Sequence, residues 1–136
     1  MAIEIGKTAS FQKAFSDEDV RLFAGISLDD NPIHLDEEYA QKSMFGQKIV
    51  HGMLVASLVS KVFGTIFPGP GCIYLGQTLK FLKPVYINQP ITATVVLTEY
   101  DEQTRKGVFK TTCTNTEGDL VIVGDAKILF NDAAKD

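Results

Sequence analysis

The pattern of apolar and polar positions divides the chain into two parts. In the second part, segments rich in Val, Ile, Thr, Tyr and Phe predict strands over residues 72–82, 91–101, 108–116 and 120–130. The last two breaks between them, "DEQTRKG" and "NTEGD", are short enough for hairpins. Near the N-terminus, residues 8–15 carry apolar side chains with a period of two, which predicts one more strand.

Short helices are predicted in the first part. Ser16, followed by three acidic residues, is typical of a helix start, so we expect a helix over residues 17–24 that ends at Gly25. Asp36 can cap a second short helix over residues 37–43.

The segment around residues 53–67 is apolar over nearly its whole circumference and stops at "PGPG". This pattern is typical of a helix buried on all sides. The economical packing is an antiparallel sheet wrapped around that helix, an α+β fold in one domain over residues 1–136. Such a sheet leaves two open edges and an apolar exterior, so we expect two copies to pair as a homodimer.

Composition and charge argue against several classes of partner. The net charge is −4 and no basic run occurs, which argues against a nucleic-acid partner. The N-terminus lacks the pattern of a signal peptide, and the longest apolar stretch carries Lys61 and is too short to cross a bilayer, so we expect no membrane partner. Cys72 and Cys113 lack metal-type spacing, and we expect them to be reduced and buried in a cytoplasmic protein.

The stretch "LDDNPIHLD" at residues 28–36 concentrates titratable groups in a small, mostly apolar domain. Pro32 disfavours a helical conformation at Asn31, so the sequence predicts a loop over residues 25–35 through which no helix runs. Three aliphatic side chains are expected to anchor this loop in the core: Leu28, Ile33 and Leu35.

A loop anchored in this way can present His34 and one aspartate to a single water molecule, one group taking its proton and the other orienting it. Two other interpretations remain open, because Asp-rich loops often only cap a helix and a lone histidine is often a core residue. No metal site is expected: no EF-hand pattern follows Asp29, and two histidines and two scattered cysteines do not form a zinc set.

A second candidate is "IVHGM" at residues 49–53, where the chain enters the long helix. A helix start offers free N–H groups, and Gly52 leaves the backbone open to a ligand oxygen, which suits a developing oxyanion. The alternative is that Gly52 is only a turn residue. His51 is expected to be structural, because this loop can aim only one side chain inward well.

Three motifs together carry a resemblance to a known family. They are Asp-x-Asn-Pro-x-His at Asp29, Asn31, Pro32 and His34, then "IVHGMLVASLVS" at 49–60 and "YLGQTLKFLKPV" at 74–85. In this order and spacing, the chain resembles (R)-specific enoyl-CoA hydratases of the MaoC-like hot-dog superfamily over nearly its whole length. The resemblance implies a hot-dog fold, in which a long central helix is wrapped by an antiparallel sheet and two copies form one continuous sheet.

The resemblance also implies roles for particular residues. Asp29 and His34 would be the catalytic pair, the N–H of Gly52 would polarise the thioester carbonyl, and Asn31 and Ser60 would support the site. The implied reaction is the reversible hydration of a trans-2-enoyl-CoA to an (R)-3-hydroxyacyl-CoA. It requires no metal or redox cofactor, and coenzyme A is part of the substrate.

Other activities remain open from the sequence. They are a dehydratase acting on acyl carrier protein, a hot-dog thioesterase, and a non-catalytic acyl-CoA-binding domain. Asp30 occupies the variable position of the motif and is expected to have no catalytic role. Five cations are candidate partners for the phosphates of coenzyme A: Lys48, Lys61, Lys80, Lys83 and Arg105.

Overall fold

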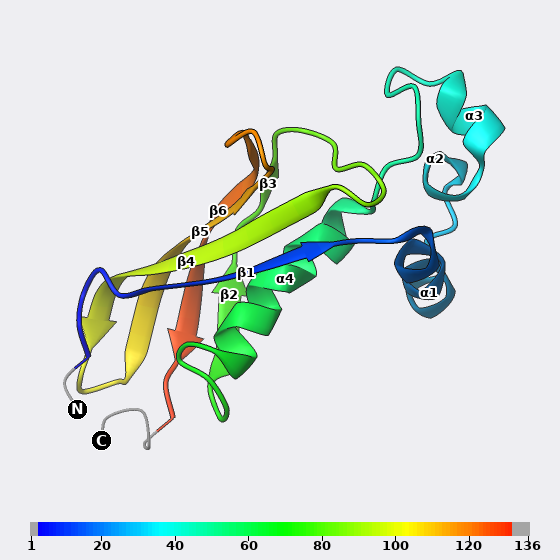
Figure 1. The fold of residues 1–136 in the computed structure, drawn as a ribbon. Coiled ribbons are helices and arrows are strands. Elements are labelled where there is room, and N and C mark those ends of the chain that lie inside the picture. The colour runs from blue at the N-terminus through cyan, green and yellow to red at the C-terminus, as the bar shows by residue number, and fades with distance from the viewer. Residues whose placement is uncertain (1–2, 132–136) are drawn as a thin grey trace.

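The computed structural model describes residues 3–131. Its strands are β1 (Thr8–Ala14), β2 (Ile73–Gln77), β3 (Lys80–Phe81), β4 (Pro90–Asp101), β5 (Lys106–Thr114) and β6 (Leu120–Leu129). Its helices are α1 (Asp17–Ser27), α2 (Pro32–Leu35), α3 (Glu37–Gln41) and α4 (Gly52–Thr65). Figure 1 shows α4 along one side of the sheet, with α1 to α3 beyond one end of it.

The strands form one antiparallel sheet in the order β1-β4-β5-β6-β2, with β3 also paired to β6. Strands β4, β5 and β6 are consecutive neighbours, as short hairpin connections require. Helix α4 packs against β4, β5 and β1. The predicted α+β arrangement, a sheet around one long helix, is therefore confirmed as the hot-dog fold.

The core lies between α4 and the concave side of the sheet. Along β4, buried residues occur at every second position from Ile91 to Leu97, which is the period of a strand with one covered face. The rings of Phe63, Phe109 and Phe130 meet in this space, with Phe63 and Phe109 edge to face at 4.8 Å. These aromatic groups fix the distance at which helix and sheet pack.

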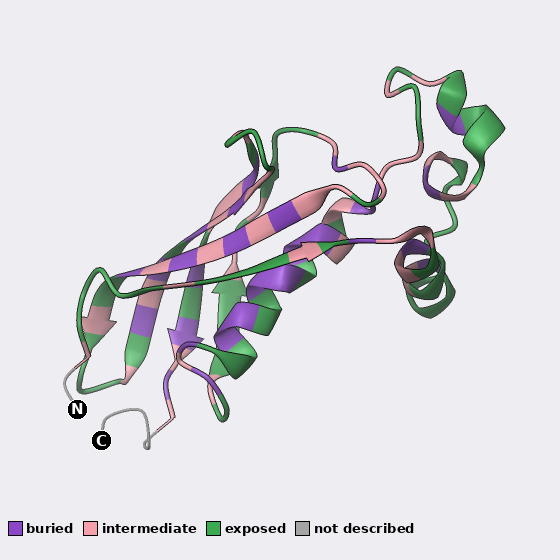
Figure 2. Cartoon of the chain, in the orientation of Figure 1, coloured by how far each residue is buried: buried purple, intermediate pink, exposed green. Residues whose placement is uncertain are grey.

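Helix α4 is not buried on all sides, which corrects the expectation from its apolar composition. The exposed residues form a stripe along one side of the helix: Met53, Ser57, Ser60, Lys61, Gly64 and Thr65. Figure 2 shows α4 striped between buried and exposed positions. The apolar side chains on its other face are covered by the sheet.

The region of residues 25–35 differs from the predicted loop. Helix α1 continues through Gly25 to Ser27, and residues Pro32–Leu35 form the short helix α2. Pro32 is the first residue of α2, where its missing N–H and fixed φ suit a helix start. Leu28 does not anchor the chain, since it is 81% exposed and caps α1 with a positive φ of 64°.

The predicted strand over residues 72–82 is divided into β2 and β3. Between them, Thr78 approaches β6 so closely that a Cβ on Gly124 would lie 1.8 Å from the Thr78 carbonyl oxygen. The Thr78 hydroxyl accepts a hydrogen bond from the Asp125 N–H at 2.9 Å, in place of the regular ladder. Glycine at 124 therefore permits this interruption of the strand.

Two expectations from composition concern a membrane span and the two cysteines. Within residues 3–131, no helix is long and apolar enough to cross a membrane. Cys113 is buried and Cys72 is only half-buried, and both are free thiols. Burial raises the pKa of the Cys113 thiol to about 11.

Candidate active site

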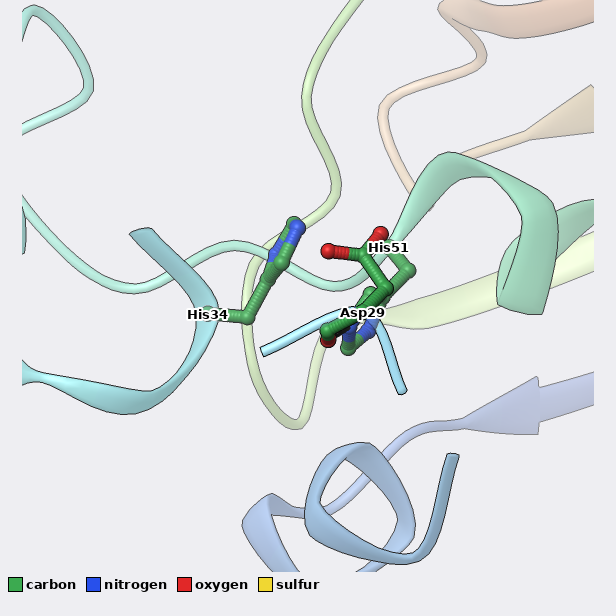
Figure 3. A group of neighbouring side chains, drawn as sticks. All are labelled: Asp29, His34 and His51. Atoms are coloured by element: carbon green, nitrogen blue, oxygen red, sulfur yellow. Dashed lines mark hydrogen bonds between the residues drawn. The ribbon is translucent and has the colours of Figure 1, made fainter. Parts of the chain in front are cut away.

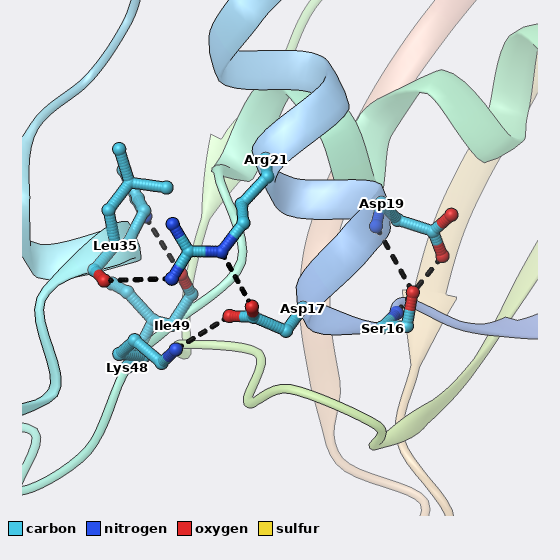
Figure 4. Close-up of polar contacts among 8 residues, drawn as sticks. Ser16, Asp17, Asp19, Arg21, Leu35, Lys48 and Ile49 are labelled. Carbon is cyan, nitrogen blue, oxygen red and sulfur yellow. Dashed lines mark hydrogen bonds and ion pairs between the residues drawn. The ribbon is translucent and has the colours of Figure 1, made fainter.

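The helical segment, which we define as residues 16–49, begins with a capping box. The Ser16 hydroxyl accepts a hydrogen bond from the Asp19 N–H, and the Asp19 carboxylate accepts one from the Ser16 N–H (Figure 4). Acidic residues in the first turn of α1 also suit the positive end of the helix. The sequence "SDED" therefore fixes where the chain leaves β1 and enters α1.

Charged side chains hold the helical segment together. The Asp17 carboxylate contacts Lys48 Nζ at 2.6 Å and Arg21 Nε at 2.7 Å, while Arg21 also donates to the carbonyl oxygen of Leu35 (Figure 4). Hydrogen bonds from Lys48 and then from Arg21 hold the pKa of Asp17 below its usual value. These contacts connect the start of α1 with the end of α2 and with the stretch that leads to α4.

Residues 29–35 form a succession of local side-chain caps. The Asp29 carboxylate accepts a hydrogen bond from the Asn31 N–H at 3.3 Å, and the Asn31 side chain accepts one from the Ile33 N–H at 3.2 Å. Asn31 is thereby the N-cap of α2. The structure thus places Asn31 as a support of the turn that presents His34.

The imidazole of His34 is buried and oriented by the backbone. Its Nδ1 lies 2.8 Å from the carbonyl oxygen of Ile49, and the Ile49 N–H in turn donates to the carbonyl of Ile33. A carbonyl oxygen can only accept, so Nδ1 carries the hydrogen and Nε2 of the neutral ring is a free base. Burial is the main cause that lowers the pKa of His34 from its usual 6.5.

His51 lies against His34 rather than away from the site, which sequence reasoning did not anticipate. The two rings stack with centroids 3.8 Å apart, and Nε2 of His51 lies 3.0 Å from the carbonyl oxygen of Asp29. Figure 3 shows Asp29, His34 and His51 gathered at one place. The only signal in the sequence was the position of His51 next to Gly52, at the same helix start.

A cavity of about 490 Å³ joins the two candidate regions. Asp29, His34, His51 and Gly52 all line it, so the structure brings together the two residues predicted to be a catalytic pair and the predicted helix start. Most of the remaining lining is apolar: Phe45, Ile49, Val50, Met53, Val55, Phe81, Leu82, Pro84, Val85 and Ile122, together with Lys83. This size and lining suit a small, mostly apolar ligand.

Three residues of the motifs lie outside the lining of this cavity. Asn31 and Asp30 are exposed and do not line it, and Ser60 lies on the exposed stripe of α4. Ser60 is eight positions after Gly52 in the helix, or about 12 Å along the helix axis. Ser60 therefore does not reach Asp29 and His34 within one chain.

Gly52 is the first residue of α4, directly after the N-cap His51. The first N–H groups of a helix have no partner within it, and His51 makes no side-chain capping bond to them. A Cβ at this position would lie 2.7 Å from Cε1 of Phe81, so the absence of a side chain lets that ring close the cavity wall. Gly52 thus offers polar N–H groups at the edge of an apolar space.

Asp29, His34 and His51 also place potential metal ligands within 4.8 Å of one another. The lone pair of an imidazole nitrogen lies in the plane of its ring. The two rings are stacked with an interplanar angle of only 26°, so their lone pairs run in nearly parallel planes. This arrangement does not suit joint coordination of one ion.

Known proteins resemble this chain over most of its length. A family model described as the MaoC like domain matches residues 2–119. An (R)-specific enoyl-CoA hydratase from Rhodospirillum rubrum is 46% identical over 127 residues, covering 93% of this chain and 88% of that protein.

Solved structures agree with this result. An (R)-hydratase from Aeromonas caviae involved in PHA biosynthesis has a TM-score of 0.93 at 39% identity, covering 95% of this chain and 98% of that one. An R-hydratase from Pseudomonas aeruginosa in the unliganded form has a TM-score of 0.90 at 37% identity, covering 94% and 82% of the two chains. The chain therefore belongs to the MaoC-like family, and its hot-dog fold carries the Asp-x-Asn-Pro-x-His motif at a cavity beside the start of the central helix.

Proposed function

We propose that this protein is an (R)-specific enoyl-CoA hydratase, a hydro-lyase that adds water reversibly to a trans-2-enoyl-CoA. The observation that carries the proposal is that one cavity combines the Asp29 carboxylate, the imidazole of His34 and the start of α4 at Gly52. Hydration needs these three functions together: two groups that move protons on one water and a donor for the thioester oxygen.

The reaction follows from the chemistry of a conjugated thioester. Its C3 is electrophilic, and attack by the water oxygen forms the C3–O bond while negative charge moves to the thioester oxygen. The N–H of Gly52 stabilises that charge, with support from the positive end of α4. Asp29 and His34 remove one proton from the water and return one to C2, which restores the thioester and yields the 3-hydroxyacyl product.

The proton roles of Asp29 and His34 belong to the pair. The hydrogen on Nδ1 of His34 is held by the Ile49 carbonyl, which leaves Nε2 for the reacting water. Because the two groups would act on one water, we assign the acid and base roles to the pair and not to either residue alone. Asn31 contributes by capping α2 and thereby orienting His34.

The apolar lining would hold the acyl chain, and the CoA portion would extend toward solvent. Of the five candidate cations, Lys83 lines the cavity, and its ammonium lies 3.1 Å from the Asp119 carboxylate with about half of its side chain exposed. We therefore favour Lys83 as a partner for a CoA phosphate. No redox cofactor or metal enters this mechanism, since the reaction is a proton-coupled addition.

We further propose that the protein acts as a homodimer in the cytoplasm, with residues 1–136 as a single domain. At the β2 edge of the sheet, Ile73, Tyr74 and Leu75 are exposed, and the stripe of α4 is open as well. Pairing of two copies there would cover both surfaces. Ser60 would then support catalysis only across the interface, and light scattering of the purified protein tests the dimer.

The function is tested by mixing the protein with crotonyl-CoA and following the enone absorbance. We expect the absorbance to fall without release of free thiol, and chiral chromatography should identify the (R)-3-hydroxy product. Thiol release would indicate a thioesterase, and the (S) product would contradict the assignment. Absence of any reaction across short and medium acyl chains would favour a binding domain.

A further inference from the structure

His51 is buried between the groups of the proposed site, although the mechanism so far gives it no part. Its side chain is 2% exposed. One face of the imidazole stacks on His34, and Phe23 meets the ring edge to face with centroids 4.8 Å apart. The ring is thereby held between α1 and α2, at the residue that precedes Gly52.

The hydrogen bond of His51 reaches the other catalytic residue. Nε2 of His51 lies 3.0 Å from the backbone carbonyl oxygen of Asp29, and since a carbonyl can only accept, Nε2 carries the hydrogen. His51 thus contacts both members of the acid–base pair, the main chain of one and the ring face of the other.

From these contacts we infer that His51 is a positioning residue, which sets Asp29 and His34 at a fixed separation from the N–H of Gly52. The inference rests on the proposed hydratase function for its effect on turnover. The peptide bond between His51 and Gly52 also supports this role, because it links the positioning residue directly to the N–H of Gly52. Any movement of the helix start would therefore carry the support of the catalytic pair with it.

The remaining nitrogen of His51 fits a positioning role. Within the part of the chain that the structure describes, Nδ1 is buried and has no hydrogen-bond partner. Buried polar atoms in this condition are rare and are destabilising, so a histidine is a poor choice for packing alone. A phenylalanine would fill the same space without this penalty but could not hold the Asp29 carbonyl.

Two substitutions separate the hydrogen bond from the ring. His51→Phe keeps an aromatic face against His34 and removes the donor. His51→Gln keeps an amide nitrogen the same number of bonds from Cβ as Nε2 and removes the ring. Because small misplacements of catalytic groups cost up to about 10²-fold, we expect His51→Phe to lower kcat by about 10- to 100-fold with little change in KM. His51→Gln should recover to within about 5-fold of the unaltered protein, since it restores the contact to Asp29.

Placing the same change in an Asp29→Asn background distinguishes positioning from a general loss of structure. If His51 acts through the catalytic pair, His51→Phe should add little to the loss already caused by Asp29→Asn. Equal losses in both backgrounds, a His51→Gln variant as poor as His51→Phe, or a His51→Phe variant as active as the unaltered protein would each overturn the inference.

A measurement on the unaltered protein does not depend on activity or on the folding of variants. The chain contains two histidines, so long-range ¹H–¹⁵N spectra of the untagged protein at mildly alkaline pH report two imidazoles. We expect His51 to carry its hydrogen on Nε2 and His34 on Nδ1. The opposite tautomer at His51 would overturn the inference even if the protein is a hydratase. The expected tautomers in a protein that does not hydrate enoyl-CoA would support the contacts and contradict only the proposed reaction.

Discussion

The sheet with α4 and the helical segment of residues 16–49 are stabilised in different ways. Between the sheet and α4, the core consists almost entirely of apolar side chains, including the stacked and edge-to-face rings around Phe109. In α1 to α3, few residues are buried, and the contacts are caps and ion pairs around Asp17 and Asn31. Figure 2 shows this contrast, with largely exposed helices beyond one end of a partly buried sheet.

This difference separates stability from chemistry. The sheet with α4 supplies most of the free energy of folding, because burial of apolar area is the main source of that energy. The helical segment supplies Asp29 and His34, whose positions depend on directional polar contacts. Substitutions in the two regions should therefore have different signatures, one in unfolding and one in turnover.

The largest effect should follow loss of the catalytic pair. We expect Asp29→Asn and His34→Gln each to lower kcat for crotonyl-CoA hydration by about 10²–10⁴-fold, with the melting temperature little changed. The double variant should be little worse than either single one, because the two groups act as a unit. Asp30→Asn is the matched control and should stay near the unaltered rate, since Asp30 is exposed and does not line the cavity. An inactive Asp30→Asn with an active Asp29→Asn would place the motif one residue out of register.

A core substitution should show the opposite signature. Phe109 is fully buried and contacts the rings of Phe63, Phe67 and Phe130. Phe109→Ala should lower the free energy of unfolding by about 3–5 kcal/mol, through lost burial and a cavity. Urea denaturation measures this, and the protein that remains folded should keep most of its turnover. A strong loss of kcat in folded protein would show that the two regions are coupled.

Gly52 lies at the boundary between the two regions. In Gly52→Val, the new side chain would meet the Phe81 ring, and we expect it to block the approach of the thioester oxygen to the backbone N–H of residue 52. Loss of such a donor lowers kcat by about 10²–10³-fold in other enzymes, and we expect a similar loss here. Steady-state kinetics of Gly52→Val and of the double variant Gly52→Val/Phe81→Ala distinguish the clash with Phe81 from the loss of contact with the thioester oxygen. Full recovery in the double variant would mean that only the clash with Phe81 mattered.

The smallest of these effects concerns pH. Burial lowers the pKa of His34 below 6.5, so its neutral form persists in the folded protein at pH values where an exposed histidine is already protonated. We expect the acidic fall of kcat/KM for hydration to begin at a lower pH than an unperturbed histidine would give, and then to reach up to about tenfold per pH unit. The same shift contributes stability that is present above the unfolded pKa and is lost as the pH falls through the folded value. His34→Gln should lack this acid-dependent contribution when melting temperatures are compared across the pH series.

The sheet with α4 was easier to predict from the sequence than the helical segment was. Strands and the long helix depend on repeated apolar positions, so β4 to β6 and α4 were located to within a few residues. Asp29, His34 and Gly52 were singled out because motif residues of particular chemistry occur at a specific spacing, and the structure places all three on one cavity. Their roles in catalysis remain a prediction.

The helical segment was harder to predict because single residues decide its local geometry. Pro32 was taken to exclude a helix, but the argument holds only for the interior of a helix and not for its first residue. Gly25 is exposed within α1, where its intrinsic cost is small enough for neighbouring residues to continue the helix. The contact of His51 with the Asp29 carbonyl joins residues 22 positions apart, and no periodicity in the sequence reports it.

The contacts of Asp17 with Lys48 and Arg21 have one more consequence, which concerns the solvent. Dissolved ions screen charges over about 8 Å at physiological ionic strength and over about 3 Å in 1 M salt, a length close to the 2.6 and 2.7 Å of these contacts, whereas apolar contacts are not weakened in this way. Concentrated salt should therefore loosen the support of the active site while the protein as a whole stays folded. We therefore expect heat to act mainly on the sheet with α4, and ionic strength to act on the helical segment. The resistance of the protein to high temperature and its resistance to high salt can then change independently in related sequences.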